Sequence, residues 1–438
     1  MTMPSMVMSR ITKVLTDSSD GVGFAEAEQR LRCVRLSISI DGEQATTPAG
    51  QAAVLTAVAT AMKCFGQISV SCPSDPALHN HRFPIGRSLM AACSSLGATI
   101  SRDGQATHQI LVGVQQSSTP FAVRCWWDGW LAGYRPRWDA VPLGSSLNPL
   151  AGVFAGALSV REVFAQVRGE SRAGRRESVI SLWEPWMHTS LRDVGPTVAY
   201  VPKKLWIVGL GHVGQGYLWN LGFLPAGTQL VLQDYQDVGD ENVGTGLITS
   251  AREVRSRKTR VAAAWADALG WRSEIIERRF TVDREIDTSR PPIVLTALDD
   301  VVPRIAVAQA RFPYLVDAGL GHSASDFEVI QVRVIRSSDQ HTWTVGLTSA
   351  SHDRLLTTEP YSELSDQCGA FTLASASVAV PFVGACAGAL VLSQAIRITS
   401  LKPTISILQT ELGSPDAISH GSEVPAPTTN PGGTEARF

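Results

Sequence analysis

The sequence predicts an α/β protein built from two units in tandem, each a mostly parallel sheet flanked by helices. Two observations lead to this fold class. Segments of the first half recur in the same order in the second half, and the recurring stretches alternate between apolar strands and helices. The chain is also long enough, with 438 residues of which 44% are hydrophobic, to bury two or three cores.

The clearest recurrence is a pair of helices rich in small residues. NPLAGVFAGALSVREVF, which begins at Asn148, aligns without a gap with VPFVGACAGALVLSQAI, which begins at Val380. Small residues four positions apart let a helix approach its neighbour closely, which suits a buried helix. The uncharged stretch 367–396 is long enough to cross a bilayer, but its Ala, Gly and Ser content and its internal Pro381 favour a buried helix over a membrane span.

Three further recurrences give the domain boundaries. A helix followed by a strand begins at Gly50 and again at Gly214, and the strands that begin at 108 and 120 match those at 292 and 313. We interpret the copies as two domains of roughly 150 to 200 residues. The predicted boundaries are 1–167 for the first domain, 168–200 for a linker and helix, 201–411 for the second domain, and 412–438 for a disordered tail rich in Pro, Gly, Ser and Thr.

Charge and cysteine content argue against several function classes. Lys and Arg number 38 and Asp and Glu 40, so the net charge of -2 provides no overall field that attracts nucleic acid or an anionic membrane. The seven cysteines are scattered without a CxxC pair, which favours reduced thiols and no zinc site. The first residues lack the apolar segment of a secretory signal, so we expect a cytoplasmic protein.

The second half carries a nucleotide-binding pattern. The apolar strand KLWIV leads into Gly209, Gly211 and Gly214, spaced as GxGxxG, and then into a helix. Such glycines let the backbone approach a phosphate at a helix N-terminus, where unpaired N–H groups and the helix dipole favour negative charge. Asp234 ends the next strand, twenty residues after Gly214, where a carboxylate can accept hydrogen bonds from ribose hydroxyls.

Further polar residues favour ATP over NAD at this site. Asn242 and Lys258 follow the second strand, and Asp299 and Asp300 end the strand VLTALDD. Hydride transfer needs neither a lysine nor a pair of acids at the nucleotide. ATP cleavage, by contrast, needs a cation on the phosphates and carboxylate ligands for Mg²⁺. We therefore predict ATP and Mg²⁺ as cofactors. An NAD-dependent oxidoreductase and a non-catalytic nucleotide-binding scaffold are the alternatives.

These motifs resemble the adenylyltransferase superfamily that contains ThiF, MoeB and the ubiquitin-activating enzymes. The resemblance covers about 201–400 and rests on GLGHVG at 209–214, Asp234-Tyr-Gln-Asp-Val238 with Asn242, Lys258, and ALDDVVPR at 297–304. It implies two Rossmann-like adenylation-type domains, the first degenerate. By this resemblance Asp234 binds the ribose, Asn242 and Lys258 bind the triphosphate, and Asp299 binds the magnesium, with Asp300 beside it in the cofactor site.

The chain departs from the family pattern in several respects. Gln236 replaces the second acid of the family's D-x-D step. Asn-Val-Gly-Thr245-Gly stands where the family has an arginine, and the candidates to replace that arginine are Arg252, Arg255, Arg257 and an arginine from the other half. The first half, 1–167, has neither the glycine pattern nor the two acids, so we predict that it does not bind ATP and call it the silent half. A silent half beside an active one resembles ubiquitin-activating enzymes, and the whole layout resembles those of bacterial ubiquitin-like conjugation operons, which are associated with antiphage defence.

The resemblance also implies a function in two chemical steps. Cys368, in SDQCGAFTLAS, matches by position the cysteine that takes the activated carbonyl in ThiF-like relatives, and a helix N-terminus nearby would stabilise its thiolate. We expect an enzyme that adenylates the C-terminal carboxylate of a small ubiquitin-like protein and passes the acyl group to Cys368 for a conjugating enzyme. Lys258, Asp299 and Cys368 are the predicted catalytic residues.

Two questions stay open from the sequence alone. Adenylation of a sulfur carrier for cofactor biosynthesis uses the same first step and is therefore an alternative to protein conjugation. The two halves form an internal pseudodimer by themselves, and a further homodimer is compatible with the same sequence.

Overall fold

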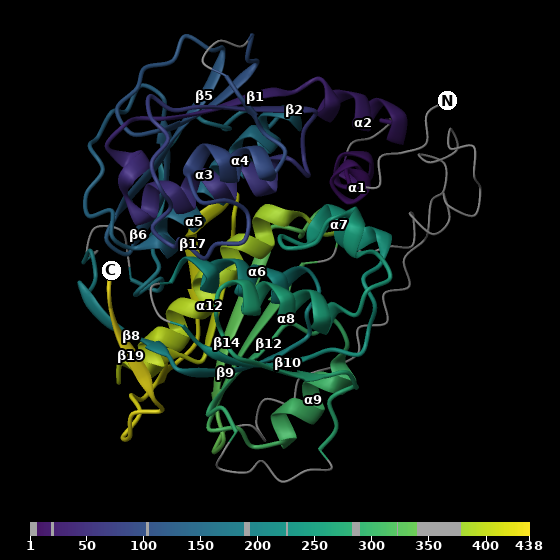
Figure 1. Ribbon diagram of the computed structural model, residues 1–438, viewed down its shortest axis with the longest axis vertical. Helices are drawn as coiled ribbons and strands as arrows, with labels where there is room; N and C mark the ends of the chain where they lie inside the picture. Colours follow the sequence, from purple (N-terminus) through teal and green to yellow (C-terminus); the bar gives the residue numbers. More distant parts are fainter. Residues whose placement is uncertain are drawn as a thin grey trace.

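The computed structural model describes residues 7–18, 22–101, 105–187, 193–224, 227–282, 290–321, 323–339 and 378–438. Within these ranges the two halves of the chain each form one large sheet, and the sheets lie at opposite ends of the view in Figure 1. Long helices from both halves lie between the sheets and pack against one another. The interface between the halves is therefore part of the core.

The sheet of the first half has, in the described ranges, the strand order β3-β2-β1-β4-β5-β6-β7. The strands from β3 to β5 are parallel, and β6 and β7 are antiparallel to their neighbours. The strands are β1 (Arg35–Ile40), β2 (Gln67–Ser71), β3 (Thr99–Ile100), β4 (His108–Val112), β5 (Phe121–Asp128), β6 (Leu131–Pro136) and β7 (Ser178–Ser181). The helices are α1 (Ser9–Ser18), α2 (Phe24–Arg32), α3 (Pro48–Ala61), α4 (Leu89–Ser95) and α5 (Pro149–Val167), with a 3-10 turn at Gln44–Thr46.

The sheet of the second half has, in the described ranges, the order β11-β10-β9-β12-β13-β14-β16-β17. Its strands are β9 (Lys204–Val208), β10 (Gln229–Gln233), β11 (Ser273–Ile276), β12 (Ile293–Thr296), β13 (Tyr314–Leu320), β14 (Val329–Arg336), β16 (Ile407–Glu411) and β17 (Ser414–His420). The helices are α6 (His212–Phe223), α7 (Asp240–Thr245), α8 (Lys258–Ala268), α9 (Val301–Gln309) and α12 (Pro381–Thr399), with a 3-10 turn at Ala251–Glu253. Short strands β8 (Val198–Pro202) and β19 (Gly433–Arg437) pair with each other, as do β15 (Thr404–Ile405) and β18 (Glu423–Val424).

The two sheets share one topology, which confirms the predicted fold class and the internal repeat. The central strands β1 and β9 correspond, as do β2 and β10, and β4 and β12. In both halves the first long helix follows the central strand, and the second long helix follows the first antiparallel strand. The aligned helices of the sequence repeat, α5 and α12, thus hold equivalent places.

The small residues of α5 and α12 serve close packing between helices. A Cβ atom on Gly156 would lie 2.3 Å from the carbonyl oxygen of Ala53 in α3, and one on Gly388 would lie 2.5 Å from that of Gly216 in α6. Both helices are long and apolar enough to cross a membrane, but 89% and 100% of their apolar windows are buried inside the protein. They are packed as core helices, in line with the sequence interpretation.

The expected disordered tail, 412–438, is wrong for this protein. β17 extends the second sheet by pairing with β16, and β19 pairs with β8. Phe438 is 1% exposed and lies 4.7 Å, centroid to centroid, from the ring of Trp130 in the first half. Strand pairing uses backbone groups that any composition supplies, so a Pro-, Gly- and Ser-rich segment with a few apolar anchors can still be ordered.

The predicted linker and helix at 168–200 also needs correction. Its described residues contribute β7, which pairs with β6 at the edge of the first sheet, and the start of β8. The charged stretch before β7 is tied down as well, because Arg176 donates to the hydroxyl of Ser414 at 2.8 Å. The segment therefore belongs to the folded body, through pairing with strands far away in the sequence.

Replacing Phe438 by Ala is expected to destabilise the protein by about 3 kcal/mol, because the buried ring that packs against Trp130 is lost. The thermal unfolding midpoint should fall. Leu401→Ala is the matched control, since Leu401 is 42% exposed and its truncation removes little buried area. Equal midpoints for the two variants would show that the C-terminal segment adds no stability.

Candidate nucleotide site

The glycine loop at 209–214 forms a tight turn that leaves space for a ligand. Gly209 has a φ of +90°, in the left-handed region, and a Cβ there would lie 2.4 Å from the carbonyl oxygen of Ala297. A Cβ on Gly214 would lie 2.1 Å from the carbonyl oxygen of Gly209. Gly211 is the N-cap of α6, and no atom of the described residues lies within 4 Å of its Cβ position. The first N–H groups of this helix, which have no partner within the helix itself, lie beside that position.

Asp234 connects the glycine loop to the end of β10. Its side chain is buried, and its Oδ2 accepts a hydrogen bond of 2.7 Å from the backbone N–H of Leu210. Its Oδ1 accepts one of 2.9 Å from the N–H of Gln236. The structure therefore brings this predicted residue to the glycine loop, where it also fixes the loop conformation.

Lys258 is brought to the same place through Gln236. Lys258 is the first residue of α8, and its Nζ donates a hydrogen bond of 2.7 Å to Oε1 of Gln236. Its backbone N–H donates to the carbonyl oxygen of Gln236 at 3.1 Å. Gln236, which stands where the family has a second acid, thus holds both Asp234 and Lys258. The sequence marked Gln236 only as a departure, and the contact gives it a role.

Asn242 lies in the short helix α7 and is buried. Its Oδ1 accepts a hydrogen bond of 2.9 Å from the N–H of Gly239, which fixes the start of that helix. Gln215 of α6 holds the segment that follows, because its Oε1 accepts from the N–H of Ile248 at 3.1 Å and from the hydroxyl of Thr249 at 2.8 Å. The segment around Thr245 is therefore docked against the helix that starts at the glycine loop.

The two acids after β12 have different environments. Asp300 is the N-cap of α9, and its Oδ1 accepts a hydrogen bond of 3.1 Å from the N–H of Val302. Asp299 is exposed at the carboxyl end of β12, next to β9 and its glycine loop. A carboxylate placed there can bind a cation together with substrate phosphates, which is how proteins usually hold Mg²⁺. Within the described residues no group of three or more His, Cys, Asp or Glu side chains forms a metal cage.

Arg304 and Asp317 support the loop that carries Asp299. Arg304 donates from Nε to the carbonyl oxygen of Leu298 at 2.7 Å, and its Nη1 lies 3.9 Å from Oδ2 of Asp317. Asp317 is buried in β13 and accepts a hydrogen bond of 2.5 Å from the hydroxyl of Thr296. The sequence analysis did not single out Asp317. The sequence feature that could have identified Asp317 is its position as a lone acid inside the apolar strand YLVDAGL.

The first half contributes an arginine to this neighbourhood. α1 lies beside α7 (Figure 1), and Arg10 of α1 interacts electrostatically with Glu241 of α7 and with His212 at the start of α6. Burial lowers the pKa of Arg10, and the charge of Glu241 opposes that shift. Arg257, by contrast, donates to the carbonyl oxygen of Tyr235 at 2.6 Å. Arg10 is thus the candidate from the other half that the sequence left unnamed.

His212 follows Gly211 in the glycine loop and is not a cation at neutral pH. Its Nε2 is sealed from solvent and has no hydrogen-bond partner in the described structure. Burial lowers the pKa of His212 to about 4, the positive charge of Arg10 lowers it further, and a bond to the Val380 carbonyl opposes the shift. A neutral imidazole packed against α12 offers no charge to a phosphate.

The equivalent place in the silent half holds an acid. Asp41 follows β1, and its two carboxylate oxygens accept hydrogen bonds from the N–H groups of Gln44 at 2.7 Å and Val114 at 3.0 Å. A Cβ on Gly113 would lie 1.8 Å from Oδ2 of Asp41. The carboxylate of Asp41 thus accepts hydrogen bonds from backbone N–H groups at this edge, and its negative charge repels anions. That the silent half does not bind ATP stays a prediction, which a negative charge at this place favours.

Cys368 lies outside the described residues, and the cysteines that are described differ in exposure. Cys33, after α2, is exposed. Burial raises the pKa of the thiols of the others, which disfavours the reactive thiolate; they are Cys64, Cys72, Cys93, Cys125 and Cys386.

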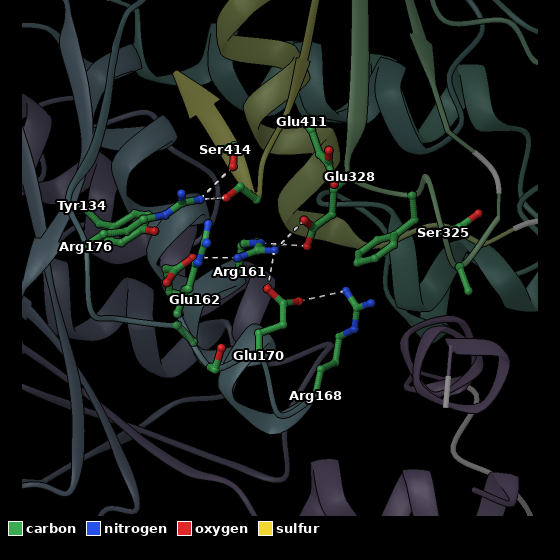
Figure 2. Close-up of a pocket in the computed structure, with 16 residues that line it drawn as sticks. Tyr134, Arg161, Glu162, Arg168, Glu170, Arg176, Ser325, Glu328, Glu411 and Ser414 are labelled. Atoms are coloured by element: carbon green, nitrogen blue, oxygen red, sulfur yellow. Dashed lines mark hydrogen bonds and ion pairs between the residues drawn. The ribbon is translucent and has the colours of Figure 1, made fainter. Parts of the chain in front are cut away.

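A polar pocket of about 420 Å³ lies away from the glycine loop, where α5 meets the second half. Figure 2 shows Arg161 at its centre, surrounded by glutamates. Arg161 donates to both carboxylate oxygens of Glu328, at 2.8 and 2.7 Å, and to Glu162 at 2.8 Å and Glu170 at 2.9 Å. Because these charged groups satisfy one another, we interpret the cluster as a structural junction between the halves.

Comparisons with known proteins cover nearly the whole chain. A family model described as the BilD C-terminal domain matches residues 201–401, and one described as the BilD N-terminal domain matches residues 35–182. The bacterial E1-like protein BilD of Collimonas sp. (strain OK412) is 32% identical over 420 residues, which are 91% of this chain and 89% of that protein.

Solved structures match part of the chain. The crystal structure of E. coli tRNA N6-threonylcarbamoyladenosine dehydratase, TcdA, is 19% identical with a TM-score of 0.32, and the match covers 44% of this chain and 84% of that one. The complex of TcdA with ATP is 18% identical with the same TM-score and the same coverage.

Proposed function

This chain belongs to the BilD family of bacterial E1-like proteins, and on that premise we propose that it activates a ubiquitin-like protein by ATP-dependent adenylation. One observation carries the proposal. The glycine loop, Asp234 and Lys258 are joined by direct hydrogen bonds through Leu210 and Gln236, at the sheet edge where Asp299 is exposed. In the proposal these residues serve as phosphate site, ribose acceptor, cation and metal-binding carboxylate, and their position at one edge supports it.

In the proposed complex each residue has a distinct task. The N–H groups at the start of α6 and the ammonium group of Lys258 bind the phosphates, Asp234 accepts from the ribose, and Asn242 contacts the triphosphate. Arg10 supplies, from the first half, the positive charge that the family arginine would bring to Thr245. Asp299 would hold Mg²⁺, which when bound neutralises charge on the phosphates.

The first chemical step needs no general base from the protein. The C-terminal carboxylate of the substrate is already ionised, and one of its oxygens attacks the α-phosphorus of ATP. The bond from that phosphorus to the bridging oxygen breaks, which gives an acyl-adenylate and pyrophosphate. The cations at the site favour this step because negative charge moves onto the leaving pyrophosphate.

The second step transfers the acyl group to sulfur. The thiolate of Cys368 attacks the carbonyl carbon of the acyl-adenylate, and AMP leaves with the electron pair of the broken C–O bond. Burial raises the pKa of thiols such as those of Cys64 and Cys386, which makes these cysteines poor nucleophiles and so favours Cys368. Cys368 itself lies outside the described residues. A conjugating enzyme then takes the acyl group from the thioester. A cytoplasmic location and the association with antiphage defence are parts of the same proposal.

Pyrophosphate exchange into ATP tests this function. We expect exchange only in the presence of a cognate ubiquitin-like protein, and only when the C-terminus of that protein is intact; the same protein with a truncated C-terminus is the control. Binding of ATP without exchange would favour the nucleotide-binding scaffold. Binding of NAD without any binding of ATP would favour the alternative that the glycine loop belongs to an NAD-dependent oxidoreductase.

A further inference from the structure

Lys63 of the silent half reaches into the second half, at the end of α3. Its Nζ donates hydrogen bonds to the carbonyl oxygens of Val243, at 2.5 Å, and Thr249, at 3.0 Å. The side chain is partly buried, and 180 and 186 residues separate it from these two partners in the sequence. A single ammonium group thus bridges the two ends of the segment 243–249.

This segment borders the phosphate end of the candidate nucleotide site. It begins directly after Asn242 and contains Thr245, which stands where the family has its arginine. Its far end is held by Gln215 of α6, which accepts hydrogen bonds from Ile248 and Thr249. Lys63 holds the same segment through the carbonyl oxygens of Val243 and Thr249. The segment is therefore fixed between the helix that follows the glycine loop and a cation of the silent half.

We propose that Lys63 is a positioning residue for the nucleotide site: it holds the segment 243–249, and through it Asn242, in the conformation that binds the triphosphate. The inference rests on the proposed function, because it assigns Lys63 a role toward ATP. It gives the silent half a task beyond packing. The residue acts through the backbone of its partners and does not itself touch the nucleotide.

The electrostatic setting makes this contact dependent on pH. The groups that face Lys63 are the carboxylate of Glu253 and the thiol of the adjacent Cys64, whose own pKa is raised by burial so that it stays neutral. Burial lowers the pKa of Lys63 to about 8, and the charge of Glu253 opposes this shift. Lys63 is therefore charged at pH 7 and loses its proton as the pH rises through about 8. The charged form is the stronger donor to carbonyl oxygens.

Three variants test the inference in ATP-dependent pyrophosphate exchange. Lys63→Met removes the donor and should raise the KM for ATP about tenfold, the usual effect of losing a charge-assisted hydrogen bond, with a much smaller change in kcat because Lys258 and Asp299 are untouched. Lys63→Arg keeps a charged donor and should retain most of the affinity. Lys402→Met, at an exposed lysine, is the matched control and should behave as the wild type.

The pH profile separates positioning from simple packing. The KM of the wild type for ATP should rise between pH 7 and 9, whereas that of Lys63→Arg should stay level, because a guanidinium group keeps its proton over this range. A packing role alone predicts the same profile for both proteins. Hydrogen exchange at the amides of Gly246 and Ile248, which bond to Asn242 and Gln215, should be faster in Lys63→Met.

Calorimetric titration with ATP alone distinguishes failure of this inference from failure of the proposed function. If the wild type binds ATP but exchanges no pyrophosphate, the proposed function falls, and a weaker affinity in Lys63→Met still supports the role of Lys63. If Lys63→Met binds ATP as the wild type does and its amides exchange equally slowly, the inference is wrong. If the wild type binds no ATP, both are wrong.

Discussion

Asp299→Ala is expected to abolish adenylation, whereas Cys368→Ala is expected to lose only the thioester. Asp299→Ala removes the exposed carboxylate at the end of β12 that would hold Mg²⁺, so the charge that develops on pyrophosphate would lose that counter-charge. Loss of such stabilisation lowers rates by about 10²-fold or more. In the proposed mechanism Cys368 acts after the acyl-adenylate has formed, so its removal should leave pyrophosphate exchange at the wild-type level.

Matched controls exist for both variants. Asp267→Asn changes an exposed acid on α8, and Cys33→Ala changes an exposed thiol of the first half. Both should exchange pyrophosphate and form the thioester normally. The readouts are exchange of labelled pyrophosphate, and an adduct with the ubiquitin-like protein that reductant removes; a thiocarboxylate on the partner would instead indicate the sulfur-carrier route. Wild-type exchange by Asp299→Ala would contradict the proposed site.

Glu328→Ala is expected to lower the free energy of unfolding by about 3 to 5 kcal/mol, because it leaves Arg161 buried without its bidentate partner. Glu328 and Arg161 come from opposite halves, and their side chains are only 4% and 5% exposed. Glu328→Gln keeps an acceptor of the same shape and should cost less. The measurement is urea-induced unfolding followed by circular dichroism and tryptophan fluorescence.

The control for this prediction is an exposed ion pair. Glu26 and Arg30 pair at 2.6 Å on the surface of α2, with side chains 57% and 47% exposed. Exposed pairs contribute at most about 1 kcal/mol, so Glu26→Ala should shift the unfolding midpoint very little. If Glu328→Ala were as mild as Glu26→Ala, the cluster around Arg161 would not be the junction that we infer from Figure 2.

Much of the second half was predictable from local patterns. The glycines 209, 211 and 214 follow an apolar strand, and their spacing alone implies a turn at a helix start. Asp234 and Asp299 end strands, and strand ends of a parallel sheet meet at one edge, so their approach to the glycine loop followed from strand order. The repeat of α5 in α12 likewise predicted a second sheet of the same design. Each of these inferences depends on residues that are close in sequence or repeated at a fixed offset.

The sequence by itself thus determined the two α/β units, the glycine loop and the acids at the strand ends, because periodicity and strand-end placement are local properties. Only the tertiary structure decided which residues meet across the halves. Lys63 at Val243, Arg10 near Glu241, Arg161 at Glu328, and β19 at β8 join positions far apart in the chain. Such contacts depend on how the helices between the sheets pack and on backbone pairing, and neither can be deduced from side-chain composition. For that reason the composition of 412–438 predicted disorder, and the sequence could not name the residues of the first half that lie near the nucleotide site.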